Sequence, residues 1–153
     1  MKILAIDPGT HCGYATSPFE SGVWDLSVGR YSGGGMRFVK LRKYLSEITT
    51  QVDMLVYEEV RGHKGTDAAQ VYGGIVAIIT EHCEHQNIPY QGVPVGTIKK
   101  FATGKGNSNK EVMLAAARGK WPEVGIVDDN QADALFLWAW AKEEYDGITD
   151  KDH

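Results

Sequence analysis

A run of four apolar residues, residues 3–6, that ends on Asp7 and turns at once through Pro8 and Gly9 constrains the fold most. A short apolar run of this kind, at residues 2–6 with Lys2, is typical of a buried strand. A carboxylate at the end of such a strand is costly to remove from water unless a positive group meets it. The fold must therefore bring something positive to Asp7.

The remaining patterns alternate between strands and helices. Further strands are predicted at residues 13–16, 22–28, 54–57 and 90–95. Helices are predicted at residues 36–52, 66–84, 97–101, 110–118 and 130–144, with Thr66 or Asp67 as the N-cap of the second. Three strands in a meander followed by alternating helices and strands predict an α/β fold, in which helices flank a mixed five-stranded sheet.

The composition is that of a globular protein, since 42% of the 153 residues are hydrophobic and 24% are charged. We expect one domain over residues 1–145 and a polar tail over residues 146–153. No secretory signal or membrane-spanning stretch is visible, and Cys12 and Cys83 form no metal-type pair. We therefore expect a cytoplasmic protein with reduced cysteines.

The net charge of −4 hides an asymmetry along the chain. Residues 99–120 hold six basic residues against Glu111 alone, whereas residues 121–153 hold nine acidic residues against Lys142 and Lys151. The basic segment can attract a polyanion, and the acidic one can collect cations. Two solvated faces of opposite charge would explain the same pattern.

Acidic residues recur where strands end. Glu58 ends the fourth predicted strand as Asp7 ends the first, and polar groups at the carboxyl ends of neighbouring strands meet at one edge of a sheet. Asp133 shares a helix face with Asp129, four residues away, and also with Asn130, three residues away. Several convergent oxygen ligands suit Mg²⁺ or Mn²⁺, and a pair of such ions can drive phosphodiester hydrolysis. Helix capping and solvent exposure are the ordinary explanations for such acids taken singly.

In their order, these motifs make the chain similar to the RuvC-type Holliday junction resolvases, which belong to the RNase H-like (retroviral integrase) superfamily. The resemblance covers residues 2–142 and is nearest to phage-type members. It is carried by ILAIDPGT with Gly13-Tyr14, by VYEEV at residues 56–60, by residues 98–112 and by NQADAL at residues 130–135.

The resemblance implies an RNase H-like nuclease domain and a homodimeric endonuclease that nicks opposed strands of Holliday junctions and other branched DNA, in a bacterial or phage-infected bacterial cell. It implies two Mg²⁺ ions per site, replaceable by Mn²⁺. The residues that match the family's metal ligands are Asp7, Glu58 and Asp133. Family members usually carry an acid or a histidine where this chain has Asn130. Asp129 reaches the same helix face, so it is our choice for the fourth ligand, with Asn130 second.

The resemblance also places a basic group at the reaction centre, Lys110, and makes the helix at residues 66–84 the dimer interface. The predicted DNA-binding residues are Arg61, Lys64, Lys99, Lys100, Lys105 and Lys110. Arg61 stands where family members often carry a base-stacking aromatic residue. An ordinary core role for the apolar side of the helix at residues 66–84 is the alternative to the interface.

Three other functions fit some of the same residues. An Asp-x-Gly-Thr strand end also opens actin-like and sugar-kinase ATPases, but these need a second phosphate loop and usually a second domain. A binding module that recognises branched DNA without cutting it is the second alternative. The third is another RNase H-like nuclease with broader substrates, including RNA.

Overall fold

The structure, a computed structural model, describes residues 1–146; the remainder of the predicted tail lies outside the described residues. Its strands are β1 (Ile3–Asp7), β2 (His11–Ala15), β3 (Ser21–Asp25), β4 (Met54–Glu59) and β5 (Tyr90–Pro94). Its helices are α1 (Met36–Ile48), the 3₁₀ turn η1 (Thr49–Gln51), α2 (Thr66–Gln86), α3 (Val95–Thr103), α4 (Lys110–Lys120), α5 (Asp129–Ala141) and the π-helical turn η2 (Lys142–Asp146).

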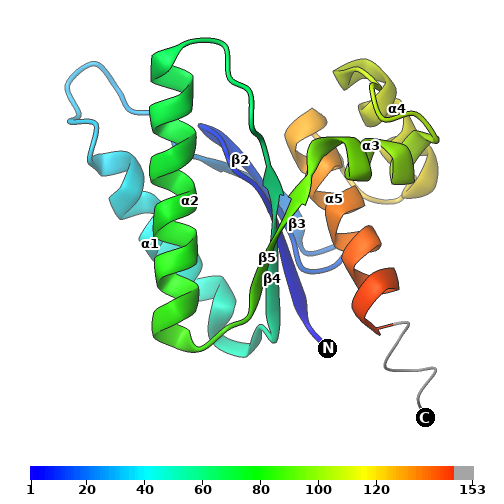
Figure 1. The fold of residues 1–153 in the computed structure, drawn as a ribbon, viewed down its shortest axis with the longest axis horizontal. Helices are drawn as coiled ribbons and strands as arrows, with labels where there is room; N and C mark the ends of the chain where they lie inside the picture. The colour runs from blue at the N-terminus through cyan, green and yellow to red at the C-terminus, as the bar shows by residue number, and fades with distance from the viewer. Residues whose placement is uncertain (147–153) are drawn as a thin grey trace.

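The five strands form one mixed sheet in the order β3-β2-β1-β4-β5, which confirms the predicted α/β fold. In the meander, β2 runs antiparallel to both β1 and β3, whereas β4 lies parallel to both β1 and β5. Figure 1 shows α1 and α2 on one face of the sheet and α3, α4 and α5 on the other. The strand that ends on Asp7 is thus the central one, covered on both faces.

Alternation along β1 explains why its residues are uniformly apolar. Ile3 and Ala5 point into the core beneath α5, while Leu4 and Ile6 point into the core beneath α1 and α2. All four side chains are fully buried. A strand with helices on both faces has no solvent-facing side, so both sets of alternate positions must be apolar.

Two predicted boundaries are wrong for identifiable local reasons. The third strand ends at Asp25 rather than at residue 28, because the Asp25 carboxylate accepts a hydrogen bond from the Ser27 backbone N–H at 2.9 Å and turns the chain. The first predicted helix ends at Ile48 rather than at residue 52, where the Thr49 hydroxyl donates to the Leu45 carbonyl at 2.6 Å.

The predicted N-cap of the second long helix is also wrong. The capping position of α2 is Gly65, which has a φ of 95° and provides no side-chain cap, and Thr66 is already the first helical residue. A positive φ is accessible to glycine at little cost, so backbone freedom sets this helix start. The other helices were located correctly, with ends that differ by a few residues.

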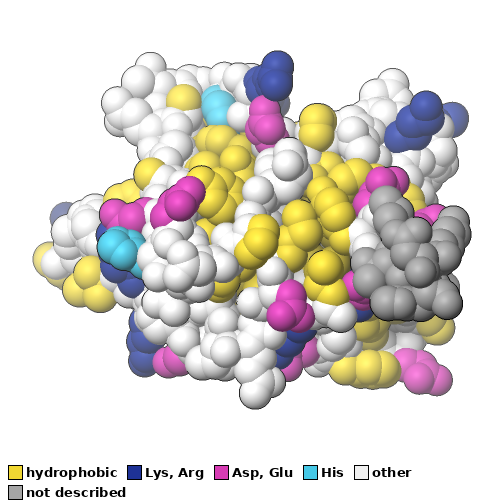
Figure 2. All heavy atoms as spheres, turned by 60° about the horizontal axis from the view of Figure 1, so that its bottom comes forward, with side chains coloured by type: hydrophobic (Ala, Val, Ile, Leu, Met, Phe, Trp, Pro, Cys, Tyr) yellow, Lys and Arg dark blue, Asp and Glu magenta, His cyan; other side chains and the backbone are white. Residues whose placement is uncertain are grey.

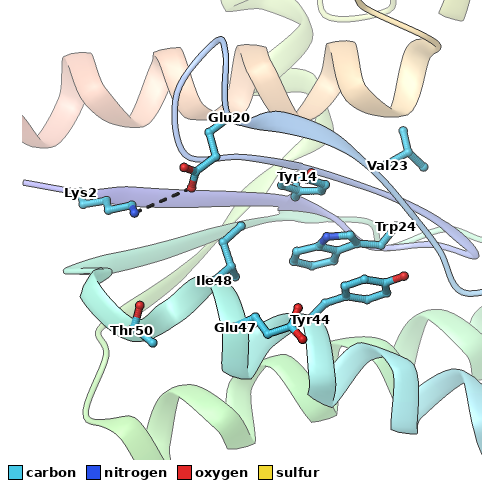
Figure 3. Close-up of a pocket in the computed structure, with 9 residues that line it drawn as sticks. All are labelled: Lys2, Tyr14, Glu20, Val23, Trp24, Tyr44, Glu47, Ile48 and Thr50. Carbon is cyan, nitrogen blue, oxygen red and sulfur yellow. Dashed lines mark ion pairs between the residues drawn. The ribbon is translucent and has the colours of Figure 1, made fainter.

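A cavity of about 640 Å³ lies on the α1 face of the sheet, opposite the face that Asp7 shares with α5. As Figure 3 shows, the rings of Tyr14, Trp24 and Tyr44 stack along it, and the ion pair between Lys2 and Glu20, at 3.8 Å, lies beside it. None of the acidic residues predicted to bind metal lines this cavity.

No helix within residues 1–146 is both long enough and apolar enough to span a membrane.

Candidate metal centre

Three acidic residues from three separate elements converge at the carboxyl end of β1. Asp7, Glu58 and Asp133 each present a carboxylate oxygen, and these three oxygens lie within 4.8 Å of one another. Asp7 ends β1, Glu58 lies near the end of β4, and Asp133 lies in the second turn of α5. The structure thus brings together three residues that are 51 and 75 positions apart in sequence.

The alternation of the two strands determines that these side chains share a face. Residues 3, 5 and 7 of β1 face α5, as do Met54, Val56 and therefore Glu58 of β4. The parallel register pairs Ile6 with Tyr57, so the next pair along the two strands is Asp7 beside Glu58. Glu59 falls on the opposite face, where its carboxylate lies over Gly92 and pairs with Arg61 at 3.0 Å.

Two carboxylate oxygens of the cluster are buried without a hydrogen-bond partner. The Glu58 side chain is 8% exposed, and its Oε2 atom has no hydrogen-bond partner; the same holds for the buried Oδ1 atom of Asp133. Buried polar atoms are normally paired with protein groups, water or an ion. Carboxylate oxygens that lie close together and lack hydrogen-bond partners are the ligands that a hard cation requires. The residues present therefore fit a divalent metal ion.

Burial and mutual repulsion disfavour the ionised form of this cluster. Desolvation, followed by the charge of Glu58, raises the pKa of Asp7 well above its ordinary value. Desolvation also raises the pKa of Asp133 to about 8, with further contributions from Glu58 and Asp129, while the nearby Lys99 opposes this shift. A bound cation would reverse these shifts by favouring the ionised carboxylates.

We expect the metal-free protein to lose stability as the pH rises from about 5 to about 9. Asp7 and Asp133 have raised pKa values in the folded protein but ordinary values, about 3.9, in the unfolded chain. The folded state therefore binds more protons over this range, and the stability that this provides is lost as the pH passes the folded pKa. Thermal unfolding in a chelator at several pH values measures the slope, and Asp133→Asn should flatten it. An unchanged slope in that variant would contradict the assignment.

The N-terminus of α5 is fixed by a side-chain cap that occupies Asn130. The Asp128 carboxylate accepts the backbone N–H of Gln131 at 2.9 Å and the side-chain amide of Asn130 at 3.2 Å. Asp129, in contrast, lies close enough to raise the pKa of both Asp7 and Asp133. Of the two candidates for a fourth ligand, Asp129 is the one whose charge acts on the cluster, whereas the Asn130 side chain is hydrogen-bonded to Asp128.

Close packing against β2 brings this helix end to the cluster. A Cβ atom on Gly13 would lie 2.0 Å from the backbone oxygen of Asn130, a distance that no side chain tolerates. Gln131, 3% exposed, accepts the Val127 N–H at 2.9 Å and donates to the Ser21 hydroxyl at 3.1 Å. Glycine at position 13 therefore allows the first turn of α5 to contact the sheet, and Gln131 ties that turn to β3.

Two residues that shape the site are not among the predicted site residues. Gln131 has a usable signal, because a glutamine among apolar residues in a predicted helix indicates a buried hydrogen bond. Tyr72 of α2 donates its hydroxyl to the Glu58 carbonyl and accepts the Val60 N–H, both at 2.9 Å. Nothing in the local sequence indicates that this tyrosine would hold the end of β4.

The predicted basic residues differ in where they lie and in what they contact. Lys99 of α3 is partly buried and lies close enough to Asp133 to affect its pKa, and it is therefore at the cluster. Arg61 is paired with Glu59 at 3.0 Å in the connection between β4 and α2. The remaining residues are exposed, and no ion pair involves them within residues 1–146: Lys64, Lys100, Lys105 and Lys110.

A second cavity adjoins the cluster. It has a volume of about 370 Å³ and is lined by the loop after Asp7, by the connection after Glu58 and by the first turns of α2, including His63 and Tyr72. The rings of His63 and Tyr72 lie 4.7 Å apart. The residues that follow Asp7 and Glu58 in the sequence therefore line a recess, although the three carboxylates themselves do not line it.

Comparisons with known proteins agree on one family. No family model matches the chain. A curated crossover junction endodeoxyribonuclease RuvC from Brachyspira hyodysenteriae is 27% identical over 150 residues, covering 90% of this chain and 91% of the relative. The structure of Thermus thermophilus RuvC matches with a TM-score of 0.74 and 18% identity over 96% of this chain and 97% of that one.

The chain is thus similar to RuvC proteins over nearly its whole length. The Thermus RuvC in complex with a Holliday junction substrate matches this chain with a TM-score of 0.67 and 18% identity, over 90% of each chain. The yeast mitochondrial Holliday junction resolvase Ydc2 matches with a TM-score of 0.59 and 10% identity, over 99% of this chain and 84% of that one. These structural matches establish that the RuvC fold extends over nearly the whole chain.

Proposed function

We propose that this protein is a divalent-metal-dependent endodeoxyribonuclease that resolves Holliday junctions and other branched DNA by paired nicks. The carboxylate cluster of Asp7, Glu58 and Asp133 carries the proposal, because its buried, unsatisfied oxygens lie at the carboxyl edge of a RuvC-type sheet. Residues 1–145 act as one nuclease domain. By its similarity to a bacterial RuvC, we place it in the cytoplasm of a bacterial or phage-infected cell.

Four residues are proposed to hold the metal: Asp7, Glu58, Asp133 and Asp129. All four offer only carboxylate oxygens, which suits Mg²⁺ and allows Mn²⁺ to replace it. When bound, a pair of such ions activates a water molecule and stabilises the leaving oxygen of a phosphodiester. The protein itself holds the carboxylates in place through the β1–β4 register, the Tyr72 hydrogen bonds and the cap of α5.

We expect Asp129→Asn to weaken Mn²⁺ binding and DNA cleavage more than Asn130→Ala does. The Asp129 carboxylate acts on the cluster, whereas the Asn130 amide is bound to Asp128. Loss of a ligand should exceed the 10- to 100-fold cost that is typical of residues supporting ligands, so we expect about 100-fold for Asp129→Asn. Titration of Mn²⁺ by electron paramagnetic resonance measures affinity without DNA. If Asn130→Ala has the larger effect, Asn130 is the fourth ligand and our choice is wrong.

Basic side chains are placed to bring a phosphate to this cluster. We propose that Lys99 contacts the scissile phosphate, since it lies near Asp133, and that Lys110 and the exposed Lys100 and Lys105 hold the backbone on either side. Arg61 and Lys64 supply contacts from the connection before α2. Figure 2, in which the bottom of Figure 1 comes forward, shows apolar side chains in the middle and Lys and Arg toward the periphery. That face therefore offers no continuous basic surface for DNA.

A homodimer is part of the proposal, because paired cuts need two active centres that face two strands. We propose α2 as the shared element. Ile75, Ile79 and Cys83 point into the core, and Gly74 lies against Phe38 of α1, so one side of α2 is committed within the chain. Its other side, which includes Gln70, Gly73 and Ala77, is exposed.

A panel of DNA substrates tests the proposed function. Purified protein with Mg²⁺ or Mn²⁺ should nick a four-way junction at symmetric positions and leave linear duplex largely intact, with forks and flaps as intermediate substrates. Binding of the junction without nicking in either metal would make this chain a branched-DNA-binding module. Comparable cutting of linear or RNA substrates would make it a nuclease of broader specificity.

A further inference from the structure

A second basic segment, which the proposed function leaves unused, precedes and begins α1. Residues 26–43 contain Arg30, Arg37, Lys40, Arg42 and Lys43 and no acidic residue. We call these residues the α1 basic segment. Within residues 1–146, the one ion pair that involves this segment joins Arg42 to Glu81 of α2 at 2.8 Å. Four of its five cations thus have no carboxylate partner at ion-pair distance.

Two of these cationic side chains, Arg37 and Lys40, are hydrogen-bonded to backbone carbonyls at the start of the segment. The Arg37 guanidinium donates to the Leu26 carbonyl at 3.0 Å, and the Lys40 ammonium donates to the Ser27 carbonyl at 3.2 Å. Each uses one donor in this way, which leaves further N–H groups for another acceptor. These two side chains are therefore held near the start of α1, and Asp25 lies close enough to Lys40 for their charges to interact.

The tip of the segment carries an exposed aromatic ring. Tyr31 is 94% exposed, and the Arg30 guanidinium lies 5.9 Å from the centre of its ring. Gly33, Gly34 and Gly35 follow, and nothing lies within 4 Å of a Cβ placed on any of them. An open loop that combines cations with an exposed aromatic ring is the combination that binds nucleic acid through phosphates and bases.

The α1 basic segment lies at the same edge of the sheet as the carboxylates. Because β2 is antiparallel to both neighbours, β3 runs in the direction of β1 and ends at the same edge. The Leu26 N–H donates to the Thr10 carbonyl at 2.7 Å, and Thr10 is three residues from Asp7. In Figure 1 the light-blue loop before α1 lies toward the upper end of the sheet, as does the start of α2.

The two basic segments flank this edge from opposite faces of the sheet. The segment at residues 99–120 belongs to α3 and α4, which lie on the α5 face, whereas the α1 basic segment lies on the other face. We propose that DNA is held from both sides: Arg30, Arg37 and Lys40 bind the phosphates of an arm that leads away from the carboxylates, and Tyr31 packs on an unpaired base at the branch. This inference rests on the proposed function and adds a second contact surface to it.

Binding measurements in a chelator, where no cutting occurs, test the inference separately from catalysis. We expect the double variant Arg30→Ala/Lys40→Ala to weaken binding of a labelled four-way junction about tenfold. We also expect the slope of log affinity against log salt to fall by about two, because each lost phosphate contact removes about one released ion. Arg42→Ala is the matched control, since it removes the same charge from the same helix but from a side chain already paired with Glu81.

The aromatic contact has its own pair of variants. Tyr31→Ala should weaken binding of the junction more than binding of a linear duplex, whereas Tyr31→Phe should retain wild-type binding of both. Unchanged affinity and salt slope in the Arg30→Ala/Lys40→Ala variant would overturn the inference while junction binding by the wild type upholds the proposed function. A change in oligomeric state in place of DNA affinity would assign the segment to a protein interface. Failure of the wild type to bind branched DNA would overturn both.

Discussion

Asp7→Asn is expected to abolish DNA cleavage while leaving junction binding intact. The substitution keeps the shape of the side chain but removes an anionic oxygen from the cluster with Glu58 and Asp133. Because even residues that only support a metal ligand typically contribute 10- to 100-fold, the loss of a ligand should lower the cleavage rate by about 1000-fold or more. Cleavage of a four-way junction under single-turnover conditions measures the loss, and binding in a chelator measures affinity.

The same variant should have the opposite effect on folding. Burial and the charge of Glu58 raise the pKa of Asp7, so its ionised form is destabilising when no cation is present. We expect metal-free Asp7→Asn protein to be more stable than the wild type near pH 8. Saturating Mn²⁺ should then stabilise the wild type more than the variant. Retained cleavage, or a variant that is less stable without metal, would show that Asp7 is not held for a cation.

Gly13→Ala is expected to lower both the stability of the protein and its affinity for Mn²⁺, although Gly13 is not itself a proposed metal ligand. The added Cβ would lie 2.0 Å from the Asn130 oxygen and 2.5 Å from its carbonyl carbon, both of which are backbone atoms. Neither atom can move without shifting the first turn of α5, which carries Asp129 and leads to Asp133. We expect a loss of about 3 kcal/mol in the free energy of unfolding, together with weaker Mn²⁺ binding.

Gly119→Ala is the matched control, because it makes the same substitution inside α4 where nothing lies within 4 Å. Because Gly119 lies in the last turn of α4, alanine there should stabilise the protein by at most about 0.5 kcal/mol, so the two variants should shift the unfolding temperature in opposite directions. A Gly13→Ala protein with wild-type stability and metal affinity would mean that α5 does not depend on this contact.

The sequence predicted the fold where periodicity and residue type agree. The apolar run before Asp7 is the central strand, and the three-strand meander and the later alternation of helices and strands give the observed mixed sheet. Predictions failed where a single side chain or an unusual backbone angle decides a boundary. Asp25 ends β3 through its bond to Ser27, and Gly65 begins α2 with a positive φ. Such local hydrogen bonds compete with regular structure and leave little trace in periodicity.

The sequence predicts which residues make up the candidate site, but it does not predict the contacts that hold them in place. Strand-end position and two-residue alternation indicate that Asp7 and Glu58 lie together, and helical spacing brings Asp133 and Asp129 to one face. The contact of Gly13 with Asn130, the bonds of Gln131 to Val127 and Ser21, and the Tyr72 bonds to β4 join residues distant in sequence. Only the three-dimensional arrangement reveals contacts of this kind.

The account as a whole depends on divalent ions at the carboxylate cluster. Crystals grown with Mn²⁺ and measured at the manganese absorption edge test this directly, because anomalous density locates the ion independently of any assay. We predict strong peaks between the carboxylates of Asp7, Glu58 and Asp133, with Asp129 within reach of one of them. Crystals in Mn²⁺ that show no peak at these carboxylates, or peaks only elsewhere on the protein, would contradict the account.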